Sequence, residues 1–425
     1  MTVHSLGIRQ TDRIVFVLTV FLLSCFMIFE KYGWGKYAFF VASGLIYLVD
    51  LLSSRKLVLK IDKIHKCFGI FVLFCFMSVL WAINRNNALE WSKSLLNNLI
   101  CITLLYPYYS KKRDISLLLS VIMWSSYTIA IYTILYYGVD KLLASSYTQY
   151  IRLGNDFSNV NVIGMFCAFG LLVQFERIMN DKRIRWYVVF ALPSLIVVAA
   201  TQSRKAVIVL VVGAILIAVL RSSDKRRIGK TIIQYFVIIL SLVFVMYLIS
   251  RISIFSGVSE RFNLLLSAIT GDGNVDSGTL NRQNYIELGM RTWLQYPFGG
   301  VGINCPRLIN AREFGENVYL HNNYVELLCG VGIAGFLIYY YMYFYLIIRL
   351  MKNRIKNKRF YIIGITWTLL LLIIDFGAVS YYSKIQAFYF MMLFINVKCL
   401  TSDKYENVKK LTSDHILEGA EYELK

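Results

Sequence analysis

The sequence has little charge and little proline for a chain of its length. Only 16% of its 425 residues are charged and only 4 are proline, whereas 57% are hydrophobic. A charged fraction this low excludes an ordinary soluble globular protein. The lack of proline-rich or glycine- and serine-rich stretches excludes a flexible linker between separate domains. The composition therefore predicts an integral membrane protein.

Acidic residues are also scarce, at 25 against 45 lysines and arginines, which gives a formal charge of +20. An excess of this size would suit a nucleic-acid-binding protein if the basic residues followed one face or one tail. They lie in short runs between apolar segments. The positive-inside rule accounts for such runs, because cytoplasmic loops of membrane proteins are rich in lysine and arginine. We therefore expect no nucleic acid among the partners.

Signals for disulfides, metals and cofactors are missing as well. The eight cysteines fall mostly within apolar segments, and Cys305 stands alone in an external one. The stretch from Asp272 begins like a calcium loop, but Ser277 replaces the required glycine and Gln283 the bidentate glutamate. The external segments hold no Asp-x-Asp pair. We expect neither a metal nor a cofactor.

Long apolar segments are what the chain has in abundance. A helix needs about 20 mostly apolar residues to cross the roughly 30 Å hydrocarbon core. Twelve segments are candidates: 14–30, 37–52, 67–83, 94–109, 115–137, 160–178, 186–201, 205–220, 232–250, 323–348, 360–376 and 380–398. Because 37–52 is short and 186–220 is nearly continuous, the number of spans lies between eleven and thirteen. No small-residue cleavage site follows the first span, so we interpret it as an anchor.

These spans divide the chain into four parts. Residues 1–250 hold nine spans, 251–320 form one large extracytoplasmic loop, 321–400 hold three spans, and 401–425 form a cytoplasmic tail. With both termini inside, lysine and arginine collect in the inner loops, as the positive-inside rule requires. The expected fold class is an all-α, multi-pass integral membrane protein of about 12 transmembrane helices.

The large external loop contains arginine but no lysine. Helical spacing of apolar residues predicts an amphipathic helix over 255–269 and a second helix over about 280–295. Arginine presents a planar fork that binds phosphate oxygens in pairs. Salt bridges to the acidic residues of the loop are the alternative. The six basic residues are Arg251, Arg261, Arg282, Arg291, Arg307 and Arg312.

Polar residues near two outer span entrances are further candidates for an anion site. Arg204 stands at the outer turn of a tight pair of spans, where an ionisable group costs roughly 2.5 to 3.5 kcal/mol and usually faces a polar cavity. Snorkelling to the interface is the alternative. Arg152 and Asn161 flank the entrance of the sixth span, where helix capping by Asn159 is the simpler interpretation.

His321 is the histidine that the predicted topology places outside. A neutral imidazole is the side chain best suited to accept a proton near neutral pH. The residue stands at the mouth of the span that begins near 323, where a helix N-terminus favours anions. Asn322, Tyr324 and Glu326 follow it. An interfacial histidine without chemistry is the alternative.

The ordered set of these motifs resembles the O-antigen ligase and Wzy-type polymerase family. The resemblance rests on Arg204 in Thr-Gln-Ser-Arg-Lys-Ala, Arg282 in Ser-Gly-Thr-Leu-Asn-Arg, the Tyr-Pro-Phe-Gly-Gly-Val-Gly run, and His321 in His-Asn-Asn-Tyr-Val-Glu before Gly-Val-Gly-Ile-Ala-Gly. It covers roughly residues 150–350. It implies a bacterial enzyme with a helical membrane fold of the GT-C class, acting at the outer face of the cytoplasmic membrane on glycans carried by undecaprenyl diphosphate.

The resemblance also implies roles for the candidates. Arg204 and Arg282 would hold the departing diphosphate in place of a metal, and His321 would activate the acceptor hydroxyl for a single inverting displacement. The expected partners are the lipid-linked oligosaccharide, membrane lipid, a flippase and a chain-length regulator. The predicted substrate-binding residues are Arg152, Asn161, Arg291, Asn322, Tyr324 and Glu326.

Two reactions of the family, and one function of another class, fit the sequence. Arg291 lies eleven residues before Gly302, similar to an Arg-x10-Gly pattern of polymerases, which favours repeat-unit polymerisation for O-antigen, capsule or exopolysaccharide. A ligase would move the finished glycan to lipid A core or another acceptor. A flippase or transporter would show deep charged residues and internal symmetry. Asp375 is the clearest deep acid, and no repeat is visible.

Overall fold

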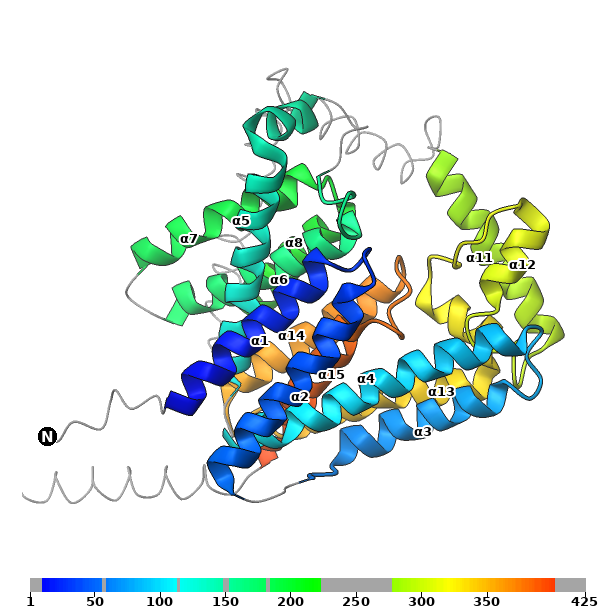
Figure 1. Ribbon diagram of the computed structural model, residues 1–425, viewed down its shortest axis with the longest axis horizontal. Helices are drawn as coiled ribbons and strands as arrows, with labels where there is room; N and C mark the ends of the chain where they lie inside the picture. Colours follow the sequence, from blue (N-terminus) through cyan, green and yellow to red (C-terminus); the bar gives the residue numbers. More distant parts are fainter. Residues whose placement is uncertain are drawn as a thin grey trace, which may run out of the picture.

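The computed structural model describes residues 10–55, 59–112, 115–147, 153–180, 184–222 and 277–401 (Figure 1). Over these ranges the chain forms helices joined by turns, with no strand. This agrees with the all-α class predicted from the sequence. The predicted span at 232–250, the predicted loop helix at 255–269 and the tail beyond Thr401 lie outside the described residues.

Eleven of the described helices coincide, within a few residues at most ends, with predicted spans. They are α1 Gln10–Ile28, α2 Trp34–Ser54, α3 Lys63–Ser78, α4 Arg85–Lys112, α5 Ser116–Tyr147, α6 Val160–Asn180, α7 Ile184–Ala200, α8 Arg204–Arg221, α13 Asn323–Lys352, α14 Lys358–Asp375 and α15 Lys384–Thr401. Five of them, α1, α2, α5, α6 and α13, are long and apolar enough to cross a membrane. The total of twelve spans stays a prediction.

Two further helices lie in the segment 251–320 that the sequence predicts to be an external loop. Helix α11 spans Ser277–Gln295, where the sequence predicts a helix over about 280–295. Helix α12 spans Pro306–Phe314 and was not predicted. Its signals were present, because Pro306 occupies the first turn and Gly315 ends the helix in the left-handed conformation.

Polar side chains cap the helices that lead into the site. Ser203 accepts a hydrogen bond from the Ala206 amide at the start of α8. Asn322 accepts from the amides of Tyr324 and Val325 at the start of α13, at 3.0 and 3.2 Å. Such caps satisfy amides that the helix itself leaves without an acceptor. The helix starts therefore follow from residue type at these two positions.

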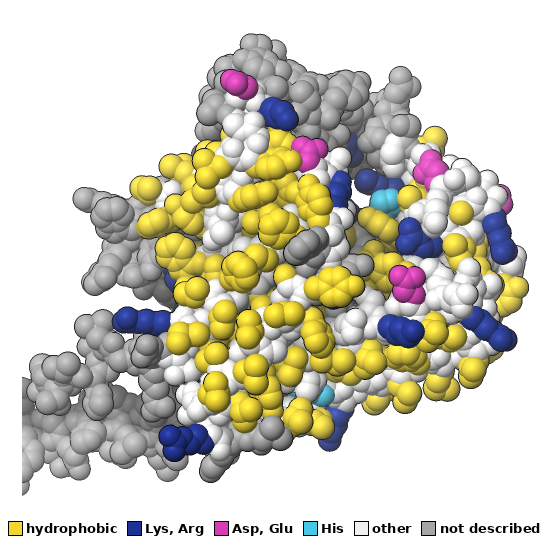
Figure 2. Space-filling model, in the orientation of Figure 1, with side chains coloured by type: hydrophobic (Ala, Val, Ile, Leu, Met, Phe, Trp, Pro, Cys, Tyr) yellow, Lys and Arg dark blue, Asp and Glu magenta, His cyan; other side chains and the backbone are white. Residues whose placement is uncertain are grey.

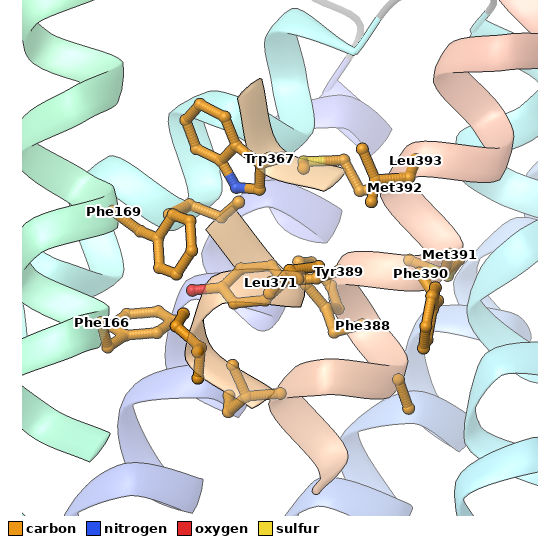
Figure 3. Packing of buried hydrophobic residues seen from close by; sticks show 14 of the residues in the cluster. Phe166, Phe169, Trp367, Leu371, Phe388, Tyr389, Phe390, Met391, Met392 and Leu393 are labelled. Atoms are coloured by element: carbon orange, nitrogen blue, oxygen red, sulfur yellow. The ribbon is translucent and has the colours of Figure 1, made fainter. Parts of the chain in front are cut away.

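The core lies where α6, α14 and α15 meet (Figure 3). Phe166 and Phe169 of α6 face Trp367 of α14 and Tyr389 of α15, and the Phe169 ring lies 4.9 Å from that of Tyr389. Nearly every residue of α15 is buried. A helix that is apolar on all sides packs inside a bundle.

Ion pairs join helix ends on the side of the molecule away from the starts of α8 and α13. These ends are the ones that the sequence places in the cytoplasm. The pairs are Lys111–Asp50 at 2.7 Å, Lys112–Asp12 at 2.5 Å, Arg359–Glu176 at 2.7 Å, and Lys398–Asp62. The acidic partners hold α1, α2, α3 and α6 to the ends of α4, α14 and α15.

The turn after α11 is locked into a break in α13. Gly332 interrupts α13 with φ 64° and ψ −174°. The break frees two carbonyl groups: the Val301 amide donates to the Cys329 oxygen at 2.9 Å, and the Gly302 amide to the Gly330 oxygen at 2.8 Å. A Cβ on Gly332 would lie 2.1 Å from the Phe298 oxygen, so no other residue fits there. We call the two hydrogen bonds from Val301 and Gly302 to the break at Gly332 the glycine clasp.

The glycine clasp also binds the turn between α3 and α4. The Trp81 indole donates to the Gly299 oxygen at 2.9 Å, and the Ile83 amide donates to the Val301 oxygen at 3.0 Å. The segment after α11 is thus attached to α13 and to the turn between α3 and α4. This attachment fixes α11 and α12 above the start of α13.

We expect Gly332→Ala to destabilise the protein by about 2 kcal/mol or more, because it combines a disfavoured φ with a backbone clash. Thermal unfolding of the purified protein in detergent measures the effect. The matched control is Gly44→Ala in α2, where an added Cβ meets nothing within 4 Å. Equal melting temperatures for both variants would contradict the packing described for the glycine clasp.

Candidate functional site

The candidate site lies at the start of α13, immediately before its first residue. His321 has φ 59°, a left-handed conformation that few residues other than glycine adopt. The flanking backbone is fixed on both sides. The Leu320 amide donates to Glu326 Oε2 at 2.8 Å, and Asn322 caps the helix. The backbone that carries the imidazole is therefore held in place by the start of α13.

Aromatic rings and positive charges surround His321. The ring of Tyr319 lies 4.4 Å from the imidazole and that of Tyr285 lies 6.2 Å away, nearly parallel to it. Burial, with the positive charges of Arg282 and Lys205, lowers the pKa of His321 to about 4. The imidazole is therefore neutral at neutral pH and able to accept a proton.

The two cations come from separate helices. Arg282 lies on α11 and is exposed. Lys205 is the second residue of α8, and its ammonium donates to the Gly377 oxygen in the turn after α14. Helices α8, α11 and α13 thus converge on His321. Figure 2 shows basic side chains and one histidine gathered around a hollow beside α11 and α12.

Lys205 was not among the predicted site residues, although it follows Arg204 directly in the sequence. Arg204 is the first residue of α8 and is partly buried. The neighbouring Ser203 hydroxyl donates to Asn161 Oδ1 at 3.1 Å, which brings the start of α6 against the start of α8. Asn161 therefore lies beside the start of α8, which carries Arg204 and Lys205. Arg152 lies outside the described residues.

Arg291 is placed differently from Arg282. Nine residues separate them on α11, which at about 100° a residue puts them on opposite faces of the helix. Arg291 makes an exposed ion pair with Glu287 at 2.8 Å. This matches the alternative interpretation of the loop arginines as salt-bridged surface residues. Its predicted contact with substrate stays a prediction that the geometry does not favour.

The three other predicted substrate-binding residues support the start of α13. Asn322 is the helix cap. The Tyr324 hydroxyl donates to the Leu372 oxygen at 2.8 Å, and its ring stacks on Tyr340 with centroids 4.9 Å apart. Glu326 is 1% exposed and receives the Leu320 amide. The geometry gives all three a supporting role, because their side chains form hydrogen bonds with the backbone of the protein.

A buried polar cluster ties α13 to the turn between α14 and α15. The Asn323 amide group donates to Asp375 Oδ2 at 3.2 Å and accepts from the backbone amide of Ser380 at 2.9 Å. The Ser380 hydroxyl donates to the other oxygen of Asp375 at 2.5 Å. Asp375, which the sequence showed only as a deep acid, therefore anchors the turn whose Gly377 holds Lys205.

The described part of the chain contains no group of three or more His, Cys, Asp or Glu residues arranged to hold a metal ion. The charges that converge on His321 are positive. Such an arrangement suits an anion, and phosphate oxygens are the anion for which arginine has the best geometry.

We expect Arg282→Ala to raise the pKa of His321 from about 4, because it removes a positive charge that opposes protonation. NMR titration of the imidazole in detergent micelles, with the signal assigned by a His321→Asn variant, measures this. Arg291→Ala is the matched control, since it removes the same charge from the other face of α11. An equal rise in both variants would mean that the effect is not local.

Residues 188–340 match the family model described as O-antigen ligase. The match confirms the resemblance identified from the sequence motifs. It spans Arg204, Arg282 and His321, together with the glycine clasp. A search of curated proteins found no match.

Proposed function

From the premise of an O-antigen ligase domain at residues 188–340, we propose that this protein is a membrane glycosyltransferase. It transfers a glycan from undecaprenyl diphosphate to a sugar hydroxyl at the outer face of the bacterial cytoplasmic membrane. The observation that carries the proposal is a neutral His321 within electrostatic range of Arg282 and Lys205. Transfer from a glycosyl diphosphate to a hydroxyl needs a base that accepts the hydroxyl proton and cations that stabilise the departing diphosphate.

In the proposed reaction, the acceptor hydroxyl oxygen attacks the anomeric carbon while the bond to the diphosphate oxygen breaks. The hydroxyl proton passes to His321, and the diphosphate leaves with the electron pair. Arg204, Arg282 and Lys205 stabilise the charge that develops on it. A single displacement of this kind inverts the anomeric centre.

The charges around His321 also set its basicity during the reaction. A pKa of about 4 makes the imidazole a weak base while the cations are bare. Burial is the largest cause of this low pKa and would remain, but a bound diphosphate would offset the positive charge of Arg282 and Lys205 and so raise the pKa of His321. The base would therefore become stronger when the donor is in place, which discourages proton uptake without substrate.

We favour polymerisation of repeat units, with transfer of a finished chain to lipid A core or another acceptor as the second candidate. Both reactions use the same lipid diphosphate, so the cations and His321 serve either one. The acceptor distinguishes them. A flippase that delivers the donor and a chain-length regulator are the proposed protein partners.

Glycan analysis of a deletion strain tests the function. For a polymerase, deletion leaves single lipid-linked repeats, and wild type restores long chains. His321→Ala is expected to lower chain formation by about 10²- to 10⁴-fold, the usual effect of losing a general base, and Arg204→Ala to fail likewise. Arg291→Ala, as the matched control, restores chains. All variants are first checked for equal protein levels in the membrane.

The other outcomes of this experiment separate the alternatives. Accumulation of long, untransferred lipid-linked chains identifies a ligase. Accumulation of repeats at the inner face identifies a flippase or transporter. Full complementation by both His321→Ala and Arg204→Ala would overturn the catalytic assignment.

The pH dependence of transfer by the purified enzyme tests the charge argument. As pH falls through the pKa of His321, the imidazole takes up a proton and the rate declines. We expect the decline in kcat/KM near pH 4, the pKa of the free site, and the decline in kcat at a higher pH, because bound diphosphate raises that pKa. A decline in kcat/KM centred near pH 6.5 would contradict the description of the site.

A further inference from the structure

A row of partly exposed aromatic rings leads from His321 to α4. Tyr319 lies 4.4 Å from His321, measured between ring centroids. At the other end, Trp91 of α4 lies 4.7 Å from Tyr382, edge to face. The turn that carries Tyr382 is joined to the start of α13, because the backbone amide of the preceding Tyr381 donates to Asn323 Oδ1 at 3.2 Å. The rings of this row belong to His321, Tyr319, Tyr382 and Trp91.

The far end of the row is fixed to α4. The Asn98 side-chain amide donates to the backbone carbonyl oxygen of Tyr382 at 2.9 Å. Asn98 in turn accepts from the Lys384 ammonium at 3.1 Å. Both Asn98 and Lys384 are buried. The position of Tyr382 is therefore fixed, because the turn before α15 cannot move away from α4 without losing these buried hydrogen bonds.

Helix α4 carries an exposed polar stripe next to Trp91. Asn86, Glu90, Lys93 and Asn97 are all exposed and follow one another at intervals of four, three and four residues. This spacing puts them on one face of the helix. Ser94, which is partly exposed, lies between the stripe and Trp91 around the helix.

The sequence predicts that the stripe reaches the outer end of a membrane span. Helix α4 has 28 residues, and its other end is held by the ion pair of Lys111 with Asp50. About 20 residues suffice to cross the hydrocarbon core. The span predicted over 94–109 places Asn97 just inside the outer edge of the core and Lys93 at that edge. Polar and charged side chains at such a position face water or a polar ligand more readily than lipid.

We propose that the α4 stripe and the aromatic row form the track along which the acceptor saccharide lies when its hydroxyl reaches His321. Asparagine amides and one charge of each sign suit a hydroxyl-rich chain, whereas the diphosphate suits the cations on α8 and α11. Helix α4 packs mainly against α2, α3 and α15, and α8 against α6 and α14. The track therefore leads away from the donor cations. Figure 2 shows charged side chains over α4 on the same face as the hollow beside α11.

This inference rests on the proposed function, and kinetics of the purified full-length enzyme in lipid nanodiscs test it. Trp91→Ala and Asn97→Leu are each expected to raise KM for the acceptor saccharide about tenfold, with KM for the lipid diphosphate donor unchanged. Asn97→Gln is expected to restore most of the affinity. The matched control is Trp124→Ala on α5, an exposed tryptophan packed against Tyr127 and Phe190.

Saccharide binding is measured separately from turnover. Added repeat-unit oligosaccharide is expected to quench tryptophan fluorescence in the His321→Asn variant, and to quench it less when Trp91 is also changed to Phe. The proposed saccharide track is overturned if the acceptor KM is unchanged in both Trp91→Ala and Asn97→Leu, or if quenching does not depend on Trp91. Turnover by the wild-type enzyme would still support the proposed glycosyltransferase function in that case. A wild-type enzyme that binds the saccharide through Trp91 without transferring it overturns the proposed function and leaves the track supported.

Discussion

The arrangement of the site depends on two backbone hydrogen bonds from the turn after α11 to a break in α13. A broken helix inside a membrane leaves carbonyl groups that lipid cannot satisfy. Here the amides of Val301 and Gly302 satisfy them. The break would be costly without the loop, and the loop would have no fixed position without the break. Each therefore stabilises the other, and Gly332 is the residue that makes both geometries compatible.

The fixed loop has an electrostatic consequence. Because the glycine clasp sets α11 over the start of α13, Arg282 lies in range of an imidazole to which it is not joined by a close hydrogen bond. Lys205 is brought to the same imidazole by a different route, through Gly377 and the turn that Asp375 anchors. Two independent parts of the fold thus deliver positive charge to one proton acceptor. The site is organised by placement of charge more than by direct contact between catalytic groups.

The positions of most helices and several site residues could be predicted from the sequence, because hydropathy and short motifs report on local environment. The span positions follow from apolar length, and the starts of α8 and α13 follow from Ser203 and Asn322 as caps. The convergence of Arg282 and His321 followed from resemblance to a family. Helix α12 was missed although Pro306 and Gly315 mark its ends, since its apolar pattern is weak.

Other features depend on contacts between distant segments, which local patterns do not contain. Glu326 looked available for substrate, but it folds back onto Leu320 and is buried. Lys205 looked like a neighbour of Arg204, but its position is set by a carbonyl 172 residues away. Arg291 stood in a suggestive spacing to Gly302, yet its position on the outer face of α11 gives it Glu287 as a partner.

The left-handed backbone at His321 has a practical consequence for trapping the enzyme with its substrates. Alanine at this position removes the imidazole and also releases the chain from a conformation that it disfavours, so it changes shape as well as chemistry. Asparagine tolerates that conformation, because its short polar side chain can hydrogen-bond to the local backbone. A His321→Asn protein would keep the entrance of α13 in place while lacking the base. It is the better starting material for imaging donor and acceptor bound together.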